Sequence, residues 1–362
     1  MSPATSSGFD PAVGAASLRP IRAPSAWIGA ELGRSDEWIH TLTGGEIDEL
    51  DAALRATQRR GLAIQAIGRA EFPLPTLAPA LAAILGTLLH GRGFVLIRGL
   101  PIARYALEEA ATIYWGLGAH LGRPLSQNAK GHLLGHVRDL GLDARDPSVR
   151  VYQTPERQTF HTDSCDIVGL LCLQKAKSGG LSSLTSSMSV YNEMARRRPD
   201  LAVLLFQPFA TDRRGEVPEG MQPYFQLPVF NEYKGQLSVI YARRYIESAQ
   251  RFPELPRLSE AQREALDLFD ALAEDATLRL DMAFEPGDMQ FLHNHTILHD
   301  RTAYVDWPEP ERKRHLLRLW LCPPNGRPLP PVYAERYGSV AIGNRGGIHV
   351  PGTRLNVPLE PV

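Results

Sequence analysis

The sequence has few cysteines, no long apolar segment and almost no net charge. Three cysteines in 362 residues are too few for a disulfide framework, and they lack the paired short spacing of a structural zinc site. A formal net charge of -1 gives no general electrostatic reason to expect nucleic acid or an anionic membrane as a partner. We therefore expect a cytoplasmic protein that binds neither nucleic acid nor membrane.

No segment has the length and apolar character of a membrane span. The most apolar stretch, 77–90, is well short of the ~20 residues that a transmembrane helix needs. The N-terminus lacks the basic region and apolar core of a secretory signal. We expect a flexible extension over 1–30, one domain over 31–325 and an irregular tail packed on that domain over 326–362. The sequence is compatible with a homo-oligomer and does not require one.

The first third of the chain has helical patterns around one short strand. Residues 46–60 carry apolar side chains at helical spacing, preceded by Thr43 and Glu46 in capping-box spacing. The segment "GFVLIRGLP", 93–101, is a β-branched run ended by Gly and Pro, which predicts a buried strand. Further helices are predicted over 77–90, 105–121, 189–206 and 259–275.

From about residue 150 the chain consists mainly of short apolar runs separated by Gly, Pro, Asn and Asp. Examples are "IVGLLCLQKA", "YFQLPVFNEYKGQLSVIYARRYI" and "RHLLRLWLCPP". Many short strands with turn signals favour a sandwich or barrel over a parallel sheet with regular crossover helices.

One candidate metal-binding pattern is "TFHTDSCD", in which His161 and Asp163 are two residues apart. On a strand or at its end, such side chains point to the same side, so an imidazole and a carboxylate would converge. The pair alone is a weak signal. Asp166 is expected to be a turn or solvent residue and not a ligand.

A second candidate is "FLHNHTILHDRTAY", which permits two interpretations. Read locally, His293, His295 and His299 follow a glycine in a spacing that resembles the metal motif of cupins. Read at long range, His299 would join His161 and Asp163 as a two-histidine, one-carboxylate triad of non-haem Fe(II) oxygenases, which leaves three coordination positions open.

The segment "RKRHLLRLWL" favours the long-range interpretation. Arg314, Leu316, Arg318 and Trp320 alternate and so share one face of a predicted strand. Two arginines that face into a barrel are costly unless they meet anions, and a guanidinium suits bidentate binding of carboxylate. A dicarboxylate co-substrate would need such an arginine.

Taken together, residues from about 93 to 322 resemble the taurine dioxygenase/TfdA family of Fe(II)- and 2-oxoglutarate-dependent dioxygenases. The resemblance rests on the ordered motifs "GFVLIRGL", "FHTD", "SGGLSSLT", "FEPGDMQFLHNHTILHDR" and "RHLLRLW". It implies an α+β protein with a double-stranded β-helix core, the jelly roll of clavaminate synthase-like enzymes, flanked by helices. It also implies an enzyme that uses Fe(II), 2-oxoglutarate and O2 to hydroxylate a small molecule.

The resemblance also implies roles for individual residues. His161, Asp163 and His299 would hold iron, and Arg314 would pair with the distal carboxylate of 2-oxoglutarate. Where the family often has threonine after the Gly-Gly pair this chain has Ser182, with Ser183 or Thr185 as substitutes. Arg318 would assist 2-oxoglutarate or an anionic substrate. Asn294 is expected in a turn or behind the ligands, and His293 and His295 are not ligands by this alignment.

The substrate is less well defined. By position in the family, the candidates for substrate contacts are Asn128, His132, His136, Tyr152, Gln153 and Arg318. A carboxylate-bearing or amino-acid-like molecule is the favoured class. The alternatives are a cupin-type metalloenzyme that uses His293, His295 and His299 without 2-oxoglutarate, and a non-catalytic relative that binds the metal or 2-oxoglutarate.

Overall fold

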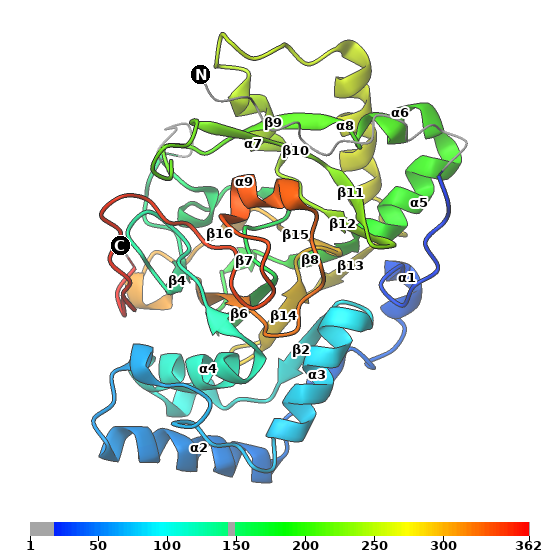
Figure 1. Cartoon of the computed structure of the whole chain (residues 1–362). Helices are drawn as coiled ribbons and strands as arrows, with labels where there is room; N and C mark the ends of the chain where they lie inside the picture. The colour runs from blue at the N-terminus through cyan, green and yellow to red at the C-terminus, as the bar shows by residue number, and fades with distance from the viewer. Residues whose placement is uncertain (1–17, 144–148, 362) are drawn as a thin grey trace.

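Two β-sheets face each other in the computed structural model, which describes residues 18–143 and 149–361 (Figure 1). The larger sheet has seven strands. Six of them lie in the order β1 (Ile39–Thr41), β2 (Phe94–Arg98), β14 (Met289–His293), β6 (Ile167–Gln174), β17 (His315–Cys322) and β3 (Arg123–Pro124), and β4 (Leu134–Val137) also pairs with β17. Only the pairing of β1 with β2 is parallel among these strands.

The smaller sheet contains four antiparallel strands. Their order is β13 (Arg279–Met282), β8 (Ser182–Ser186), β15 (Ile297–Arg301) and β5 (Gln158–His161). Three two-stranded ribbons complete the β-structure: β9 (Pro208–Asp212) with β10 (Tyr224–Pro228), β11 (Phe230–Tyr233) with β12 (Gln236–Val239), and β7 (Ser178–Gly179) with β16 (Tyr304–Val305).

The space between the two sheets is filled by alternate residues of their strands. Leu316 and Trp320 of β17 share one buried cluster with Leu184 of β8 and Ile297 of β15. The intervening leucines of β17 belong to a different cluster on the outer face of the larger sheet. This period of two is the one predicted for 314–320, and the facing sheets form the predicted jelly roll.

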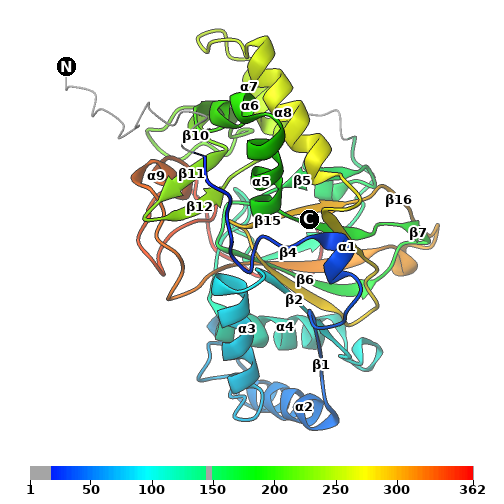
Figure 2. The same ribbon diagram turned by 90° about the vertical axis from the view of Figure 1, so that its right-hand side faces the viewer.

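Helices cover the outer faces of both sheets (Figure 2). On the larger sheet lie α3 (Ala78–His90) and α4 (Leu107–Leu121), with α2 (Gly44–Arg59) packed on α4. The smaller sheet is covered by α5 (Ser187–Arg197), α6 (Pro199–Leu204) and α8 (Glu260–Ala273). The remaining helices are α1 (Gly29–Leu32), α7 (Arg243–Ala249) and α9 (Ala334–Tyr337). No helix in these described ranges is both long and apolar enough to span a membrane.

Local sequence signals account for most of these helices. The predicted capping boxes are formed: Thr43 accepts from the Glu46 N–H at the start of α2, and Ser259 accepts from that of Gln262 at the start of α8. The helix predicted over 189–206 is instead two helices that meet at Pro199, because proline lacks an N–H and disfavours helical backbone at the preceding residue.

One prediction about the strands also needs correction. Residues 243–246, which belong to a run predicted as strands, form the start of α7. The expected flexible extension over 1–30 lies partly outside the described residues, and its described part, 18–30, packs on the protein. Trp27 is 9% exposed and donates its indole N–H to the Arg92 carbonyl, and the Ile21 N–H binds Asn192.

Candidate active site

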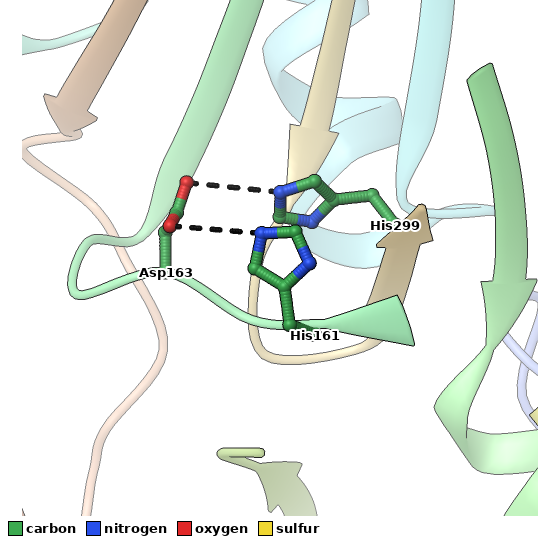
Figure 3. A group of neighbouring side chains, drawn as sticks. All are labelled: His161, Asp163 and His299. Atoms are coloured by element: carbon green, nitrogen blue, oxygen red, sulfur yellow. Dashed lines mark ion pairs between the residues drawn. The ribbon is translucent and has the colours of Figure 1, made fainter. Parts of the chain in front are cut away.

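His161, Asp163 and His299 meet at one end of the jelly roll (Figure 3). His161 ends β5 and faces His299 of β15 in the antiparallel register, and Asp163 follows two residues later in the loop to β6. One potential ligand atom from each residue lies within 4.8 Å of those of the other two. The fold therefore brings together the three residues that the sequence pattern had grouped at long range.

The Asp163 carboxylate is held in its ionised form. Burial alone would raise its pKa, but the Arg318 guanidinium and a hydrogen bond with His299 lower the pKa below its usual range. Arg318 Nη1 lies 3.7 Å from Asp163 Oδ2, and the Trp320 indole N–H donates to the same oxygen at 2.9 Å. An ionised carboxylate of fixed orientation is suited to binding a cation.

The two imidazoles present their Nε2 atoms to this carboxylate. His299 Nε2 lies 3.7 Å from Asp163 Oδ2, and His161 Nε2 lies 4.0 Å from Asp163 Oδ1. His161 Nδ1–H donates to the Thr159 carbonyl at 2.8 Å, which makes Nε2 the acceptor atom, and the Gln158 amide donates to Nε2 at 2.8 Å in the place where a metal would bind. Burial, and then the neighbouring His299, lower the pKa of His161 to about 3. Its imidazole is therefore neutral at physiological pH, and neutral imidazole is the form that binds metals.

Asn294 fixes the loop that carries Asp163. Its side-chain oxygen accepts from the Asp163 N–H at 2.8 Å, and its amide donates to the carbonyls of Asp163 and Cys165 at 2.6 and 2.9 Å. This matches the expectation of a residue behind the ligands. Because the turn between β14 and β15 supplies this side chain, the strand that carries His299 and the loop that carries Asp163 are tied together.

His293 and His295 do not join His299. His295 Nε2 is 2.7 Å from Asp166 Oδ1, and His293 Nδ1 is 3.0 Å from Thr296 Oγ1. Asp166 lies in the bend before β6 and outside the triad, as expected, but the alternative that it is a solvent residue was wrong. It is 1% exposed and ion-paired with Arg345 at 2.7 Å, a partner that local sequence could not reveal.

Beside the triad lies a pocket rich in positive charge, here called the anion pocket, which Ser182, Arg301 and Arg314 line and beside whose arginines Tyr304 packs. Arg301 and Arg314 are 6% and 4% exposed, and their guanidinium carbons lie 4.8 and 5.1 Å from the centroid of the Tyr304 ring. Within the described residues, Arg314 Nη1, Arg301 Nη1 and the Tyr304 hydroxyl are buried without a hydrogen-bond partner. Burial lowers the pKa of Arg301 to about 10.

Unpaired buried guanidinium groups are costly, so this pocket fits an anionic group that is absent from the protein itself. Ser182, Arg301 and Arg314 line the same small cavity as His161 and His299, so an anion held there would lie next to the triad. Arg301 lies two residues after His299, on the same strand face, and this spacing is the sequence signal that points to it.

The structure separates the three hydroxyl residues that follow the Gly-Gly pair. Ser182 lines the anion pocket and lies opposite Arg301 in the pairing of β8 with β15. Ser183 instead donates to Asp281 at 2.6 Å, and Thr185 donates to the Ala273 carbonyl at 2.8 Å. Among the three, only Ser182 is placed to contact an anion in the pocket.

A larger cavity, here called the open cavity, also borders His161 and Asp163 and has a volume of about 350 Å³. Tyr152 and Arg318 line it, as expected of substrate candidates. The cavity also receives residues from segments that we had not connected with the site: Arg150, Glu216, Phe225, Tyr245 and Arg336.

The other substrate candidates do not line the open cavity. Asn128 Nδ2 lies 3.1 Å from His132 Nδ1, and Gln153 accepts from the Arg150 N–H. His136 Nδ1 is 2.7 Å from His315 Nε2. These four residues line a separate small pocket together with Tyr152 and Arg318, and the hydrogen bonds named here hold its turns and strand contacts.

Comparison with known proteins gives the family. Residues 57–320 match the taurine catabolism dioxygenase TauD, TfdA family, which covers more than half of the chain. This chain belongs to the TauD/TfdA family.

Two relatives support the TauD/TfdA assignment over most of the chain. FR-33289 synthase of Streptomyces rubellomurinus is 33% identical over 330 residues, which cover 89% of this chain and 96% of that protein. The taurine hydroxylase-like protein SAT17 of Stachybotrys chartarum is 31% identical over 317 residues, which cover 83% of this chain and 81% of SAT17.

A solved structure supports the fold. Asparagine oxygenase in complex with Fe(II), 2S,3S-3-hydroxyasparagine and succinate has a TM-score of 0.61 at 16% identity, over 79% of this chain and 93% of that one. The predicted family and jelly-roll fold are therefore confirmed. As a TauD/TfdA member, the protein is a non-haem iron dioxygenase whose cofactor is Fe(II) and whose co-substrate is 2-oxoglutarate. The triad and the anion pocket offer ligands for each.

Proposed function

We propose that this dioxygenase couples oxidative decarboxylation of 2-oxoglutarate to succinate and CO2 with hydroxylation of a small carboxylate-bearing or amino-acid-like molecule. The observation that carries the proposal is that the triad borders two different spaces. One is the anion pocket, in which Arg301 and Arg314 have buried guanidinium nitrogens without a hydrogen-bond partner among the described residues, and the other is the open cavity. One space suits a dicarboxylate of fixed structure, and the other suits a second substrate.

In this proposal His161, Asp163 and His299 bind the iron. Arg318 and Trp320 keep the Asp163 carboxylate ionised and oriented, and the Thr159 carbonyl fixes the tautomer of His161. Asn294 holds the loop in register with β15. These contacts place the donor atoms before any metal arrives, which lowers the cost of reorganisation on binding.

The anion pocket would bind the distal carboxylate of 2-oxoglutarate. Arg314 supplies a planar pair of N–H donors, and Arg301, Tyr304 and Ser182 supply further donors within the same buried space. Burial from water strengthens each of these hydrogen bonds.

The open cavity would hold the molecule to be oxidised, with Tyr152 and Arg318 in its wall next to Asp163. Iron bound with 2-oxoglutarate supplies the activation of O2 that oxidises a substrate C–H bond. The residues of this chain bind both substrates, orient them and exclude bulk water from the space between them.

Release of succinate from 2-oxoglutarate by the purified protein, with Fe(II), ascorbate and pooled substrate candidates, tests the proposal. His161→Ala should abolish succinate release and lower iron content severalfold or more, because one of three ligands is lost. His295→Ala is the matched control, since that imidazole contacts Asp166 and not the triad. Loss of iron in His295→Ala with full retention in His161→Ala would favour a cupin-type centre. Binding of iron and 2-oxoglutarate without turnover in any pool would favour a non-catalytic relative.

A further inference from the structure

Most arginines that line the open cavity are neutralised by carboxylates within the protein. Arg150 pairs with Glu216 at 2.7 Å, and Arg157 pairs with Asp300 and Glu274 at 3.0 Å. Arg243 pairs with Glu247 at 2.8 Å and with two further carboxylates. These arginines therefore have no need of an anionic ligand.

Arg336 differs from them. It lies on α9, the short helix of the C-terminal tail that packs beside β10 (Figure 1). Its Nε–H donates to Ser164 Oγ at 2.6 Å, and no carboxylate of the described residues comes within 4.0 Å of its guanidinium. Burial lowers the pKa of Arg336, and the Glu216 carboxylate, which is already paired with Arg150, offsets this effect only in part.

A second arginine increases the positive charge at this position. The guanidinium carbons of Arg213 and Arg336 lie 5.2 and 5.4 Å from the centroid of the same Phe225 ring. Arg213 is 2% exposed, and its Nη1 has no hydrogen-bond partner among the described residues. Arg213 donates its Nε–H and Nη2–H to the Gln222 and Glu335 carbonyls and is not among the residues that line the cavity. It therefore adds positive charge behind Arg336, and Arg336 is the group in the wall that an anion would meet.

The position of Arg336 limits how far an anion would lie from the triad. Its hydrogen bond goes to Ser164, the residue after Asp163, and the hydroxyl of the next tail residue, Tyr337, lies 3.4 Å from the Asp163 carbonyl. The stacked ring and the Ser164 bond fix the plane of the guanidinium, which leaves its Nη donors for a ligand. A small molecule could reach from Arg336 to the metal side of the cavity.

The remaining lining of the cavity indicates what the rest of such a ligand is like. Glu216 and Glu247 are already paired with arginines, and Asp163 belongs to the triad. Leu227, Val229, Ile240 and Ile348 add apolar lining, beside hydroxyl groups such as those of Thr211 and Tyr245. Oxyanion groups and carbon chains therefore find partners here, whereas each of these lining carboxylates is already paired with an arginine or belongs to the triad, so none is left to neutralise an ammonium group.

We propose that Arg336 binds an oxyanion group of the substrate, and that the substrate is a small organic anion with an apolar carbon chain and no free ammonium group. This inference rests on the proposed function, because it assigns the second substrate of the same site. It narrows the substrate to carboxylates, phosphates or phosphonates and excludes zwitterionic amino acids.

Binding of four chain-matched probes to the full-length enzyme tests the proposal: valerate, n-butylphosphonate, norvaline and pentanamide. Dissociation constants are measured by calorimetry without O2, with Fe(II) present and 2-oxoglutarate saturating so that the anion pocket is filled. At least one of the two anions should bind tenfold or more tightly than norvaline and pentanamide. The anion that binds more tightly shows whether the site prefers a carboxylate or a phosphonate group.

Arg336→Met should weaken binding of that anion tenfold or more and leave the KM for 2-oxoglutarate unchanged. The affinity of Arg336→Lys for the anion should lie between those of the wild type and Arg336→Met. Arg198→Met, which removes an exposed arginine that is paired with Asp200 and Glu264 and does not line the cavity, is the control and should change binding less than twofold. Tight binding of norvaline or pentanamide, failure of both anions to bind, or full affinity in a folded Arg336→Met variant would each overturn the proposal. Absence of 2-oxoglutarate binding in the wild-type enzyme would instead contradict the proposed dioxygenase function.

Discussion

At the residue scale, the arginines of this protein differ in role because they differ in partner. Arg157 and Arg243 meet carboxylates of the chain, whereas Arg301 and Arg314 are buried with guanidinium nitrogens that meet no acceptor among the described residues. The same side chain therefore stabilises the fold in one place and prepares a binding site in another, and burial without a counter-charge distinguishes the two cases.

Arg314→Met should raise the KM for 2-oxoglutarate at least about 30-fold, equivalent to about 2 kcal/mol, because a buried carboxylate loses a charge-assisted pair. Steady-state kinetics with varied 2-oxoglutarate measure this change. Arg104→Met removes an exposed arginine distant from the site and should change the KM less than twofold. An unchanged KM in Arg314→Met would place the anchor at Arg301 or Arg318 instead.

At the element scale, the loop between β5 and β6 is held by chain segments that are far away in the sequence. Asn294 from the turn between β14 and β15 binds its backbone, Arg345 of the tail binds Asp166, and Tyr337 of α9 lies against the Asp163 carbonyl. The irregular tail is therefore part of the support for the triad, and it also supplies Arg336 to the open cavity.

Arg345→Met should destabilise the protein by about 3–5 kcal/mol, because it leaves the buried Asp166 carboxylate with one partner fewer. The free energy of unfolding in urea measures this effect. Arg198→Met breaks only exposed ion pairs and should cost about 1 kcal/mol or less. Equal costs in the two variants would show that the tail contributes little to this loop.

At the scale of the whole molecule, burial makes the histidines a source of pH-dependent stability. Burial lowers the pKa of seven histidines, and the values for His161 and His315 fall to about 3. In the unfolded chain these groups titrate near a pKa of about 6.5. Between about pH 6.5 and 3 the unfolded state therefore binds more protons than the folded state.

The metal-free protein should lose stability as pH falls below about 6.5, by roughly 1.4 kcal/mol per pH unit for each histidine kept neutral by the fold. Urea unfolding at pH 7, 6 and 5 measures the slope. His315→Gln removes one of these groups and should reduce the slope between pH 6 and 5 relative to the wild type. A slope that is the same in both proteins would mean that His315 takes up its proton without unfolding.

Several features of the fold and site follow from local sequence because their physics is local. The capping boxes at Thr43 and Ser259 involve backbone and side chains within one turn, and the inward face of 314–320 follows from the alternation of a strand. His161 and Asp163 are neighbours in the chain, so their convergence could be predicted from spacing alone. The break at Pro199 was equally local, and we overlooked it.

What the sequence by itself determined is therefore the set of ligand types, the alternation that turns Leu316 and Trp320 inward, and the starts of two helices. Only the tertiary structure decided which distant groups meet. It pairs Asp166 with Arg345, leaves buried guanidinium nitrogens of Arg301 without a hydrogen-bond partner among the described residues, and places Arg336 in the wall of the open cavity. The physical reason is that the cost of burying a charge depends on what the folded chain places around it, and those neighbours come from segments far apart in the sequence.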